Sequence, residues 1–174
     1  MSLAFFTVAS LDLLGTLTTN TTPEQRKDYI DWIYANQHPK GGFRAFPGTN
    51  LGPEHTTPEN EHWDPANLPA TYFALSLLLI LGDDFARVRR TETLAWLRLV
   101  QRDDGSFGET FVLGKVHGGT DSRFGYCGMG VRYILRGFDE GPIDGVEDVS
   151  VPKFVECIRL SEVSSTACVV ISDR

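Results

Sequence analysis

The feature that most constrains the fold of this chain is a short pattern that occurs twice. Each copy contains a tryptophan, a glutamine five positions later, a glycine turn and a phenylalanine: Trp32, Gln37, Gly41, Gly42 and Phe43 in the first copy, and Trp96, Gln101, Gly105 and Phe107 in the second. A glycine directly after a helix closes its C-terminus, and a following aromatic residue packs against the last turn. Such a stop is common by itself, but two copies with matching spacing favour a repeated helical hairpin.

The spacing of apolar residues predicts an all-α fold, because strand-like alternation is nowhere sustained for more than a few residues. Repeated hairpins bury their apolar faces only against neighbours, so a partial set leaves an open flank. Thr22, Pro23 and Gln25 predict a capping box at the start of the second helix. The predicted helices cover residues 3–14, 23–36, 70–81, 89–101 and 121–135, and a sixth begins at Ser150.

Two segments depart from the helical plan. Residues 38–69 contain six prolines and several glycines and predict a long connection, which in a compact domain is usually functional or disordered. After Glu162 the sequence becomes rich in serine and β-branched residues and loses the helical period. We therefore expect residues 163–174 to form a tail that does not continue the preceding helical plan.

Composition excludes several classes of protein. The 174 residues suit one domain, and the net charge of −7 argues against general nucleic-acid binding, which needs clustered cations. Three cysteines without a CxxC pair are typical of a reducing compartment, so we expect a cytoplasmic protein. The longest apolar stretch, residues 75–81, is far shorter than the roughly 20 residues of a membrane span, and residues 1–14 lack the basic leader of a signal peptide.

Beyond the repeat, several motifs follow one another in the order of a known family. They are Gly-Gly-Phe-Arg at 41–44, Thr-Tyr-Phe-Ala-Leu at 71–75, Ile-Leu-Gly-Asp-Asp at 80–84, Gln-Arg-Asp-Asp-Gly-Ser-Phe at 101–107, and Gly-Gly-Thr-Asp-Ser-Arg-Phe-Gly-Tyr-Cys at 118–127. Over about residues 2–162 the sequence resembles the β subunits of protein prenyltransferases, members of the α/α-toroid family. The resemblance implies a toroid of helical hairpins, of which this chain would form a part.

Within that family the type I geranylgeranyltransferase β subunits are most similar, because of the Leu-Gly-Asp-Asp run and the opening Leu-Ala-Phe-Phe at 3–6. Ser2 aligns with a bulky tryptophan of the farnesyl enzymes, and a small residue there leaves room for a 20-carbon lipid. The resemblance implies transfer of a geranylgeranyl group from its diphosphate to the cysteine of a C-terminal CaaX sequence. It also implies a heterodimer with a separate α subunit and a catalytic zinc bound by Asp, Cys and His, which holds the substrate thiol as thiolate.

Residue by residue, the resemblance assigns isoprenoid contacts to Arg123 and Tyr126, which share one helix face, and also to Ser2. It assigns the pocket for the last residues of the CaaX peptide to Phe124, Asn67 and Pro69. Simpler roles are available for each residue without the resemblance. Arg123 could pair with Asp121 or a carbonyl, Tyr126 and Phe124 could belong to the core, and residues 67–69 could be loop.

The family's zinc ligands and most of its diphosphate-binding residues follow the region that this sequence matches. Neither His117 nor the pair His55 and His62 has the ligand spacing of a zinc site, so we assign no catalytic or metal residue here. The sequence therefore predicts a partial toroid domain over residues 1–162, cut within its first helix, and an unrelated tail over 163–174. The Val-Ser at 163–164 is what a 5′ splice signal encodes when an intron is read in frame, and full-length transcripts test this origin.

Three functions remain open at this point. The first is the N-terminal portion of a geranylgeranyltransferase β subunit, expected to be inactive alone because the zinc ligands and most diphosphate-binding residues are absent. The second is a noncatalytic half-toroid that binds the α subunit or an isoprenoid. The third, a terpene cyclase relative, is less favoured because Asp83 and Asp84 follow Leu-Gly and do not form a DxDD motif.

Overall fold

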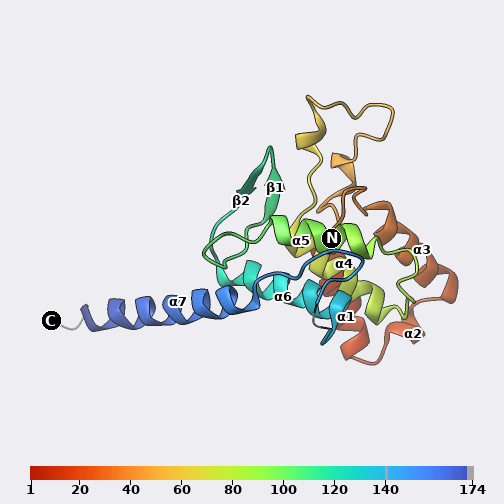
Figure 1. The fold of residues 1–174 in the computed structure, drawn as a ribbon. Coiled ribbons are helices and arrows are strands. Elements are labelled where there is room, and N and C mark those ends of the chain that lie inside the picture. The colour runs from red at the N-terminus through yellow and green to blue at the C-terminus, as the bar shows by residue number, and fades with distance from the viewer. Residues whose placement is uncertain (140, 172–174) are drawn as a thin grey trace.

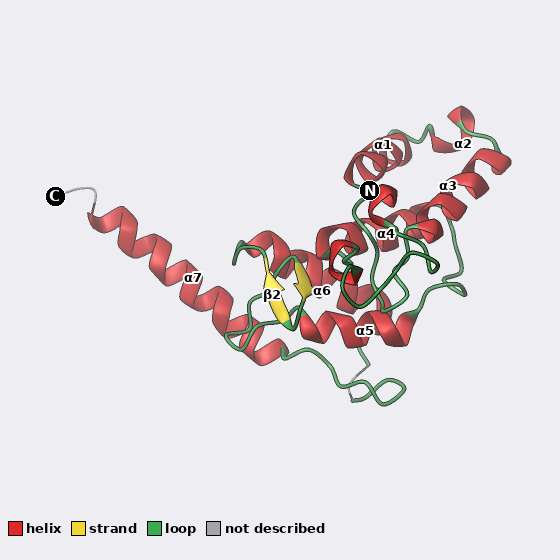
Figure 2. Cartoon of the chain, turned by 90° about the horizontal axis from the view of Figure 1, so that it is seen from above, coloured by secondary structure: helices red, strands yellow, loops and turns green. Residues whose placement is uncertain are grey.

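The computed structural model describes the backbone of residues 1–139 and 141–171, and side chains as far as residue 161. Helices dominate these residues, as the sequence predicted (Figures 1 and 2). The α-helices are α1 (Ser2–Leu13), α2 (Leu17–Asn20), α3 (Pro23–Ala35), α4 (Leu68–Ile80), α5 (Arg90–Leu99), α6 (Ser122–Arg136) and α7 (Val151–Ile171). Two 3₁₀ turns, Pro47–Thr49 and Glu61–Trp63, lie in the long connection, and two strands, β1 (Thr110–Val112) and β2 (Lys115–His117), form a hairpin.

The longer helices form an inner row and an outer row. Helix α4 packs against both α1 and α6, so α1, α4 and α6 make one row, while α3 packs on α4 and α5 packs on α6. Helix α7 begins beside α6 and then runs away from the body of the molecule (Figure 1). Alternation of inner and outer helices along the chain is the arrangement of stacked hairpins that the repeat predicted.

The hydrophobic core lies around α4. Ala74, Leu75 and Leu78 of this helix are fully buried, and so are residues on several other sides of it. A helix that is apolar all round is one enclosed by its neighbours, and this confirms the prediction for residues 70–81. The capping box at Thr22 and Gln25 is also present, with both reciprocal hydrogen bonds.

Both copies of the repeat fold in the same way. Gln37 pairs with Phe43 and Gln101 with Phe107 in isolated antiparallel bridges, and both phenylalanines are buried. The Gln37 amide donates to the carbonyl of Arg87 and accepts from the N–H of Arg89, at 3.0 and 2.8 Å. The Gln101 amide makes the equivalent pair of bonds with the backbone of Ser150, at 3.1 and 2.7 Å. Each glutamine thus fixes the chain just before the next outer helix.

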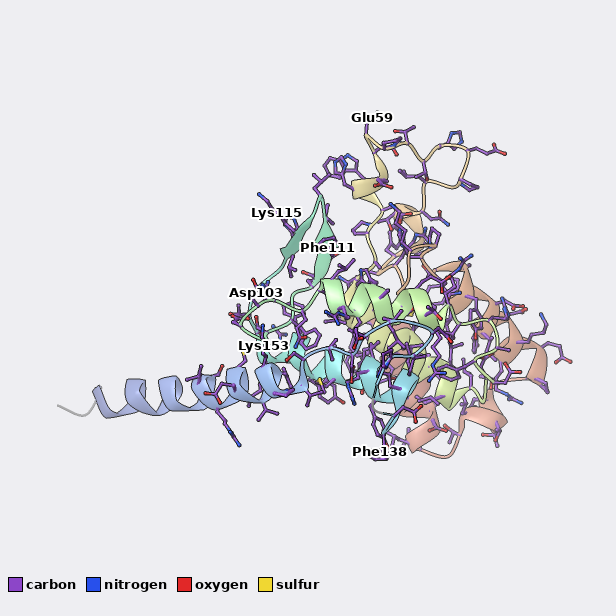
Figure 3. All side chains as sticks on the ribbon, in the orientation of Figure 1. Glu59, Asp103, Phe111, Lys115, Phe138 and Lys153 are labelled. Atoms are coloured by element: carbon purple, nitrogen blue, oxygen red, sulfur yellow. The ribbon has the colours of Figure 1, made fainter. Side chains whose placement is uncertain are left out.

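The turn glycines dock on that same outer helix. A Cβ atom at Gly41 would lie 2.2 Å from the carbonyl oxygen of Glu92 in α5, and one at Gly105 would lie 2.2 Å from the carbonyl oxygen of Lys153 in α7. Figure 3 labels Lys153 next to Asp103 of this second turn. Both glycines have positive φ, of 98° and 89°, so the turn conformation and the close approach both require glycine.

Two elements differ from the sequence prediction. The hairpin of β1 and β2 was not predicted, because strands of three residues are too short to show alternation. Its two-residue turn, Leu113 and Gly114, has φ of 49° and 75°, and a leucine in that conformation is not a recognisable turn signal.

The helical pattern of the sequence decays near residue 162, but the backbone of α7 continues to Ile171. Residues 163–171 contain no glycine or proline, so nothing in them stops a helix locally. Residues 172–174 of the predicted tail lie outside the described residues, and a domain boundary at 162 stays a prediction. None of the helices among the described residues is long and apolar enough to cross a membrane.

Candidate functional site

A row of aromatic side chains crosses the inner helices. Phe5 of α1 stacks on Phe73 of α4, with ring centroids 4.7 Å apart, and Phe6 lies 5.8 Å from the same ring. Tyr72 continues the row at 5.8 Å from Phe73 and meets Tyr126 of α6 edge to face at 5.2 Å. We call these five residues the aromatic row. Phe6 and Tyr126 remain 59% and 65% exposed, so the row presents an apolar surface to whatever lies against the inner helices.

The Tyr72 and Tyr126 hydroxyls complete this row without adding charge. Their oxygen atoms are 2.8 Å apart, and burial together with this hydrogen bond raises the pKa of Tyr72 to about 12. The Tyr72 hydroxyl therefore stays protonated at neutral pH. Its ring fits against α6 because residue 130 is glycine, where a Cβ atom would come within 2.5 Å of the ring.

Arg123 lies at the start of α6, one turn before Tyr126. Its guanidinium pairs with Asp121 through Nε and one terminal nitrogen, each at 3.0 Å, and its side chain is 85% exposed. Asp121 also accepts the backbone N–H of Arg123 and caps the helix, and these hydrogen bonds lower the pKa of the Asp121 carboxyl. The simpler role considered for Arg123, a pair with Asp121, is therefore present in this structure.

The other predicted site residues lie at the ends of the same helices. Ser2 is the exposed first residue of α1 and shares a helix side with Phe5 and Phe6, which follow it by three and four positions. Phe124 is half-buried in the first turn of α6, and Tyr126 is too exposed to be a core residue.

Asn67 is the N-cap of α4 and Pro69 lies in its first turn, so of the two only Asn67 precedes the helix. The Asn67 side chain accepts the N–H of Ala70 at 3.0 Å and donates to the Glu109 carboxylate at 2.9 Å, so its amide orientation is fixed from both sides. The site residues predicted on α4 and α6 thus lie on two helices that pack side by side. Their proposed contacts with a peptide stay predictions.

Sequence reasoning gave no role to four members of the aromatic row: Phe5, Phe6, Tyr72 and Phe73. Each of them lies within a stretch that carried the family resemblance. The aromatic residues that form the row were therefore visible in the sequence, near the starts of three helices. What the sequence could not show is that these rings touch, because that depends on how α1, α4 and α6 pack.

Cys127 lies next to the aromatic row but is buried, and its surroundings make its thiol unreactive. Burial raises the pKa of the Cys127 thiol to about 11 from an ordinary value of 9.0, and the nearby Arg123 charge only partly opposes this. Since the thiolate is the nucleophile, we expect Cys127 in the folded protein to be alkylated at pH 8 at least about a hundredfold more slowly than in denaturant. Peptide mapping after timed treatment with iodoacetamide measures this, and equal rates in both conditions would contradict it.

A cleft of about 870 Å³ lies away from the aromatic row. The long connection, the ends of α3 and α5, and the tip of the hairpin line it. Figure 3 shows Glu59 at the tip of the connection and Lys115 on the neighbouring hairpin. Four of its charged lining residues are paired with one another, since Lys40 meets Glu61 and Arg44 meets Asp64. The cleft contains no member of the aromatic row.

The family resemblance implies zinc, and we tested whether the side chains fit such an ion. Among residues 1–139 and 141–161, no three His, Cys, Asp or Glu side chains come together as a group that could hold a metal. The described part of the chain therefore does not fit a zinc centre.

Comparison with known proteins agrees with this architecture. The family model described as "Prenyltransferase alpha-alpha toroid domain" matches residues 1–166. The chain belongs to the prenyltransferase α/α-toroid family. This confirms the all-α toroid fold that the repeat and the motifs predicted.

Individual relatives make the likeness more specific. This toroid chain is 35% identical over 155 residues to the geranylgeranyl transferase type-1 subunit beta of Dictyostelium discoideum, which covers 78% of the chain and 42% of the relative. The Arabidopsis thaliana protein of the same name is 34% identical over 70 residues, or 40% of the chain and 18% of the relative.

A solved structure, the Candida albicans protein geranylgeranyltransferase-I complexed with GGPP, superposes with a TM-score of 0.72. It is 21% identical, and the match covers 90% of this toroid chain and 43% of the solved one. These comparisons confirm the resemblance to type I β subunits. The chain spans less than half the length of each of these relatives.

Proposed function

We propose that this chain is the N-terminal portion of a protein geranylgeranyltransferase type I β subunit and that the aromatic row lines its isoprenoid site. The whole enzyme would transfer a geranylgeranyl group from its diphosphate to the cysteine of C-terminal CaaX proteins, in the cytoplasm, as a heterodimer with an α subunit. The observation that carries the proposal is the aromatic row itself. It is continuous over three helices, partly exposed and without charge, as a lipid chain requires.

The predicted site residues take their roles around this row. Tyr126 and Ser2 would contact the isoprenoid, with Arg123 at the polar edge. Phe124, Asn67 and Pro69, which lie at the starts of α4 and α6, would shape the pocket for the end of the CaaX peptide. The Glu109 carboxylate would hold the Asn67 amide in one orientation for that purpose.

These 174 residues are expected to be inactive alone. The resemblance assigns the zinc ligands and most diphosphate contacts to the part of the relatives that this chain does not span. The first test measures transfer of labelled geranylgeranyl to a CaaX peptide ending in leucine, by the chain together with its α subunit, with zinc present and farnesyl diphosphate as a parallel donor. A longer version reaching past Glu162 serves as the positive control. Robust transfer by the 174 residues would contradict the expected inactivity.

Binding of the lipid can be measured without transfer. Replacing Tyr126 with alanine removes one end of the aromatic row, and we expect affinity for a fluorescent geranylgeranyl diphosphate analogue to fall about tenfold. Tyr126→Phe keeps the ring and loses only the bond to Tyr72, so it should bind almost normally. Phe138→Ala is the matched control, because Phe138 is an 88% exposed aromatic residue outside the row. Equal affinities in all four proteins would contradict the lipid site.

The second candidate function is a noncatalytic half-toroid that holds an isoprenoid or an α subunit. The same row supports it, since lipid contact needs no metal. Lipid binding by the 174 residues, with no transfer even by the longer version and its α subunit, would favour this function over the enzyme.

A further inference from the structure

The segment that leads into α6 lies on the surface and carries Arg123 of the candidate site together with its partner Asp121. Residues 117–123 are all exposed. Among the residues that the structure describes, no backbone-to-backbone hydrogen bond joins residues 118–120 to the rest of the chain. Packing and backbone pairing therefore do little to fix the place where α6 begins.

The entry into α4, at the equivalent place after the first copy of the repeat, is fixed by its backbone. The N–H of Asn67 donates to the carbonyl of Phe43 at 2.9 Å. The N–H of Leu68 donates to the carbonyl of Glu109 at 2.8 Å. The start of α6 has no such pair of bonds, so its position depends on another contact.

Arg102 makes that contact. Its guanidinium donates to the carbonyl of Gly118 at 2.7 Å through one terminal nitrogen and to the carbonyl of Gly119 at 3.2 Å through the other. Among the described residues, Arg102 alone binds these two carbonyls. The planar guanidinium suits this two-point bond, whereas a lysine ammonium is a single point of charge. Gly108 leaves room for it, because a Cβ atom there would lie 3.0 Å from the nitrogen that binds Gly118.

The repeat shows that the turn after α5 forms without an arginine. His38 takes the position of Arg102 in the first copy, directly after the repeat glutamine. The N–H of His38 donates to the carbonyl of Gly42 at 2.9 Å, and the N–H of Arg102 makes the equivalent bond to Ser106 at 2.8 Å. The Arg102 side chain has only one long contact in its own turn, of 3.4 Å to the Ser106 hydroxyl. Its guanidinium therefore acts mainly on the segment before α6.

We propose that Arg102 is a positioning residue for Arg123. By fixing the carbonyls of the two glycines, it sets where the chain reaches Asp121. The Asp121 carboxylate in turn caps α6 and accepts the Arg123 guanidinium at 3.0 Å. Arg123 is thereby held at the polar edge of the aromatic row. This role rests on the proposed function, because it concerns the isoprenoid site.

The first test needs no lipid. The N–H groups of Arg123 and Phe124 donate to the carboxylate and the carbonyl of Asp121, at 2.8 and 3.0 Å. We expect Arg102→Ala to speed hydrogen exchange of these two amides at least about tenfold, as measured by NMR. Arg98→Ala is the matched control, because Arg98 of α5 also donates to a backbone carbonyl but in a different loop. It should leave both exchange rates unchanged.

The second test measures binding of the fluorescent geranylgeranyl diphosphate analogue by single and double variants of the 174-residue chain. Arg102→Ala should weaken binding about fivefold and Arg123→Ala about tenfold. Because Arg102 acts through Arg123, the double variant should bind no more weakly than Arg123→Ala alone. A merely structural role would instead give additive losses, of about fiftyfold.

Arg102→Lys keeps the charge and loses the two-point bond, so its exchange rates and affinity should resemble those of Arg102→Ala. Far-UV circular dichroism checks that every variant folds. Unchanged exchange in Arg102→Ala, or additive losses in the double variant, would overturn the role of Arg102 while the wild-type chain still bound lipid. A wild-type chain that binds no lipid would overturn the proposed function, and the role of Arg102 in lipid binding with it.

Discussion

Replacement of Gly105 with alanine should destabilise the chain by about 3 kcal/mol or more, because two costs act at one position. The residue has a φ of 89°, which an L side chain rarely adopts. The added Cβ would also lie 2.2 Å from the carbonyl oxygen of Lys153. This oxygen belongs to the backbone of α7 and cannot move aside cheaply. The measurement is the free energy of unfolding from urea denaturation followed by circular dichroism.

The repeat supplies a second variant and a control for this experiment. Gly41→Ala should cost as much as Gly105→Ala, because its Cβ would meet Glu92 at the same distance. Gly15→Ala isolates the conformational cost, since Gly15 has a φ of 67° with no atom within 4 Å of its Cβ position. We expect it to cost about 1–2 kcal/mol. If the three variants were equally stable, docking of the glycine turns on the outer helices would not contribute to stability.

Loss of the Asp64 carboxylate should also strongly destabilise the folded chain. Asp64 accepts two hydrogen bonds from the Arg44 guanidinium, at 2.6 and 2.7 Å, and the two side chains are only 7% and 6% exposed. Asp64→Ala leaves a buried cation without its partner, so we expect a loss of about 3–5 kcal/mol. Urea denaturation measures this change as well.

Glu61→Ala is the matched control for Asp64→Ala. Glu61 also pairs across the long connection, with Lys40 at 2.6 Å, but these side chains are 45% and 68% exposed. An exposed pair contributes about 0–1 kcal/mol, so its removal should change stability little. Similar losses for Glu61→Ala and Asp64→Ala would show that burial does not set the strength of the Arg44 pair.

The residues in these predictions differ in how well their roles could be predicted from the sequence. The glycines at 41 and 105 were predicted as helix stops from the repeat alone, because a turn with positive φ leaves a local signature. The residues on which these glycines dock, Glu92 and Lys153, could not be predicted, because they follow much later in the chain. Asp64 gave no signal at all, because its pairing with Arg44 depends on how the long connection folds back.

The helical hairpins, their glycine stops and the family could all be predicted from the sequence. These follow from residues close together in the chain, where spacing and turn chemistry act directly. The meeting of Phe5, Phe73, Tyr72 and Tyr126 could not be predicted in this way and is seen only in the folded chain. Contacts between helices depend on how α1, α4 and α6 pack, and the local sequence does not record that packing.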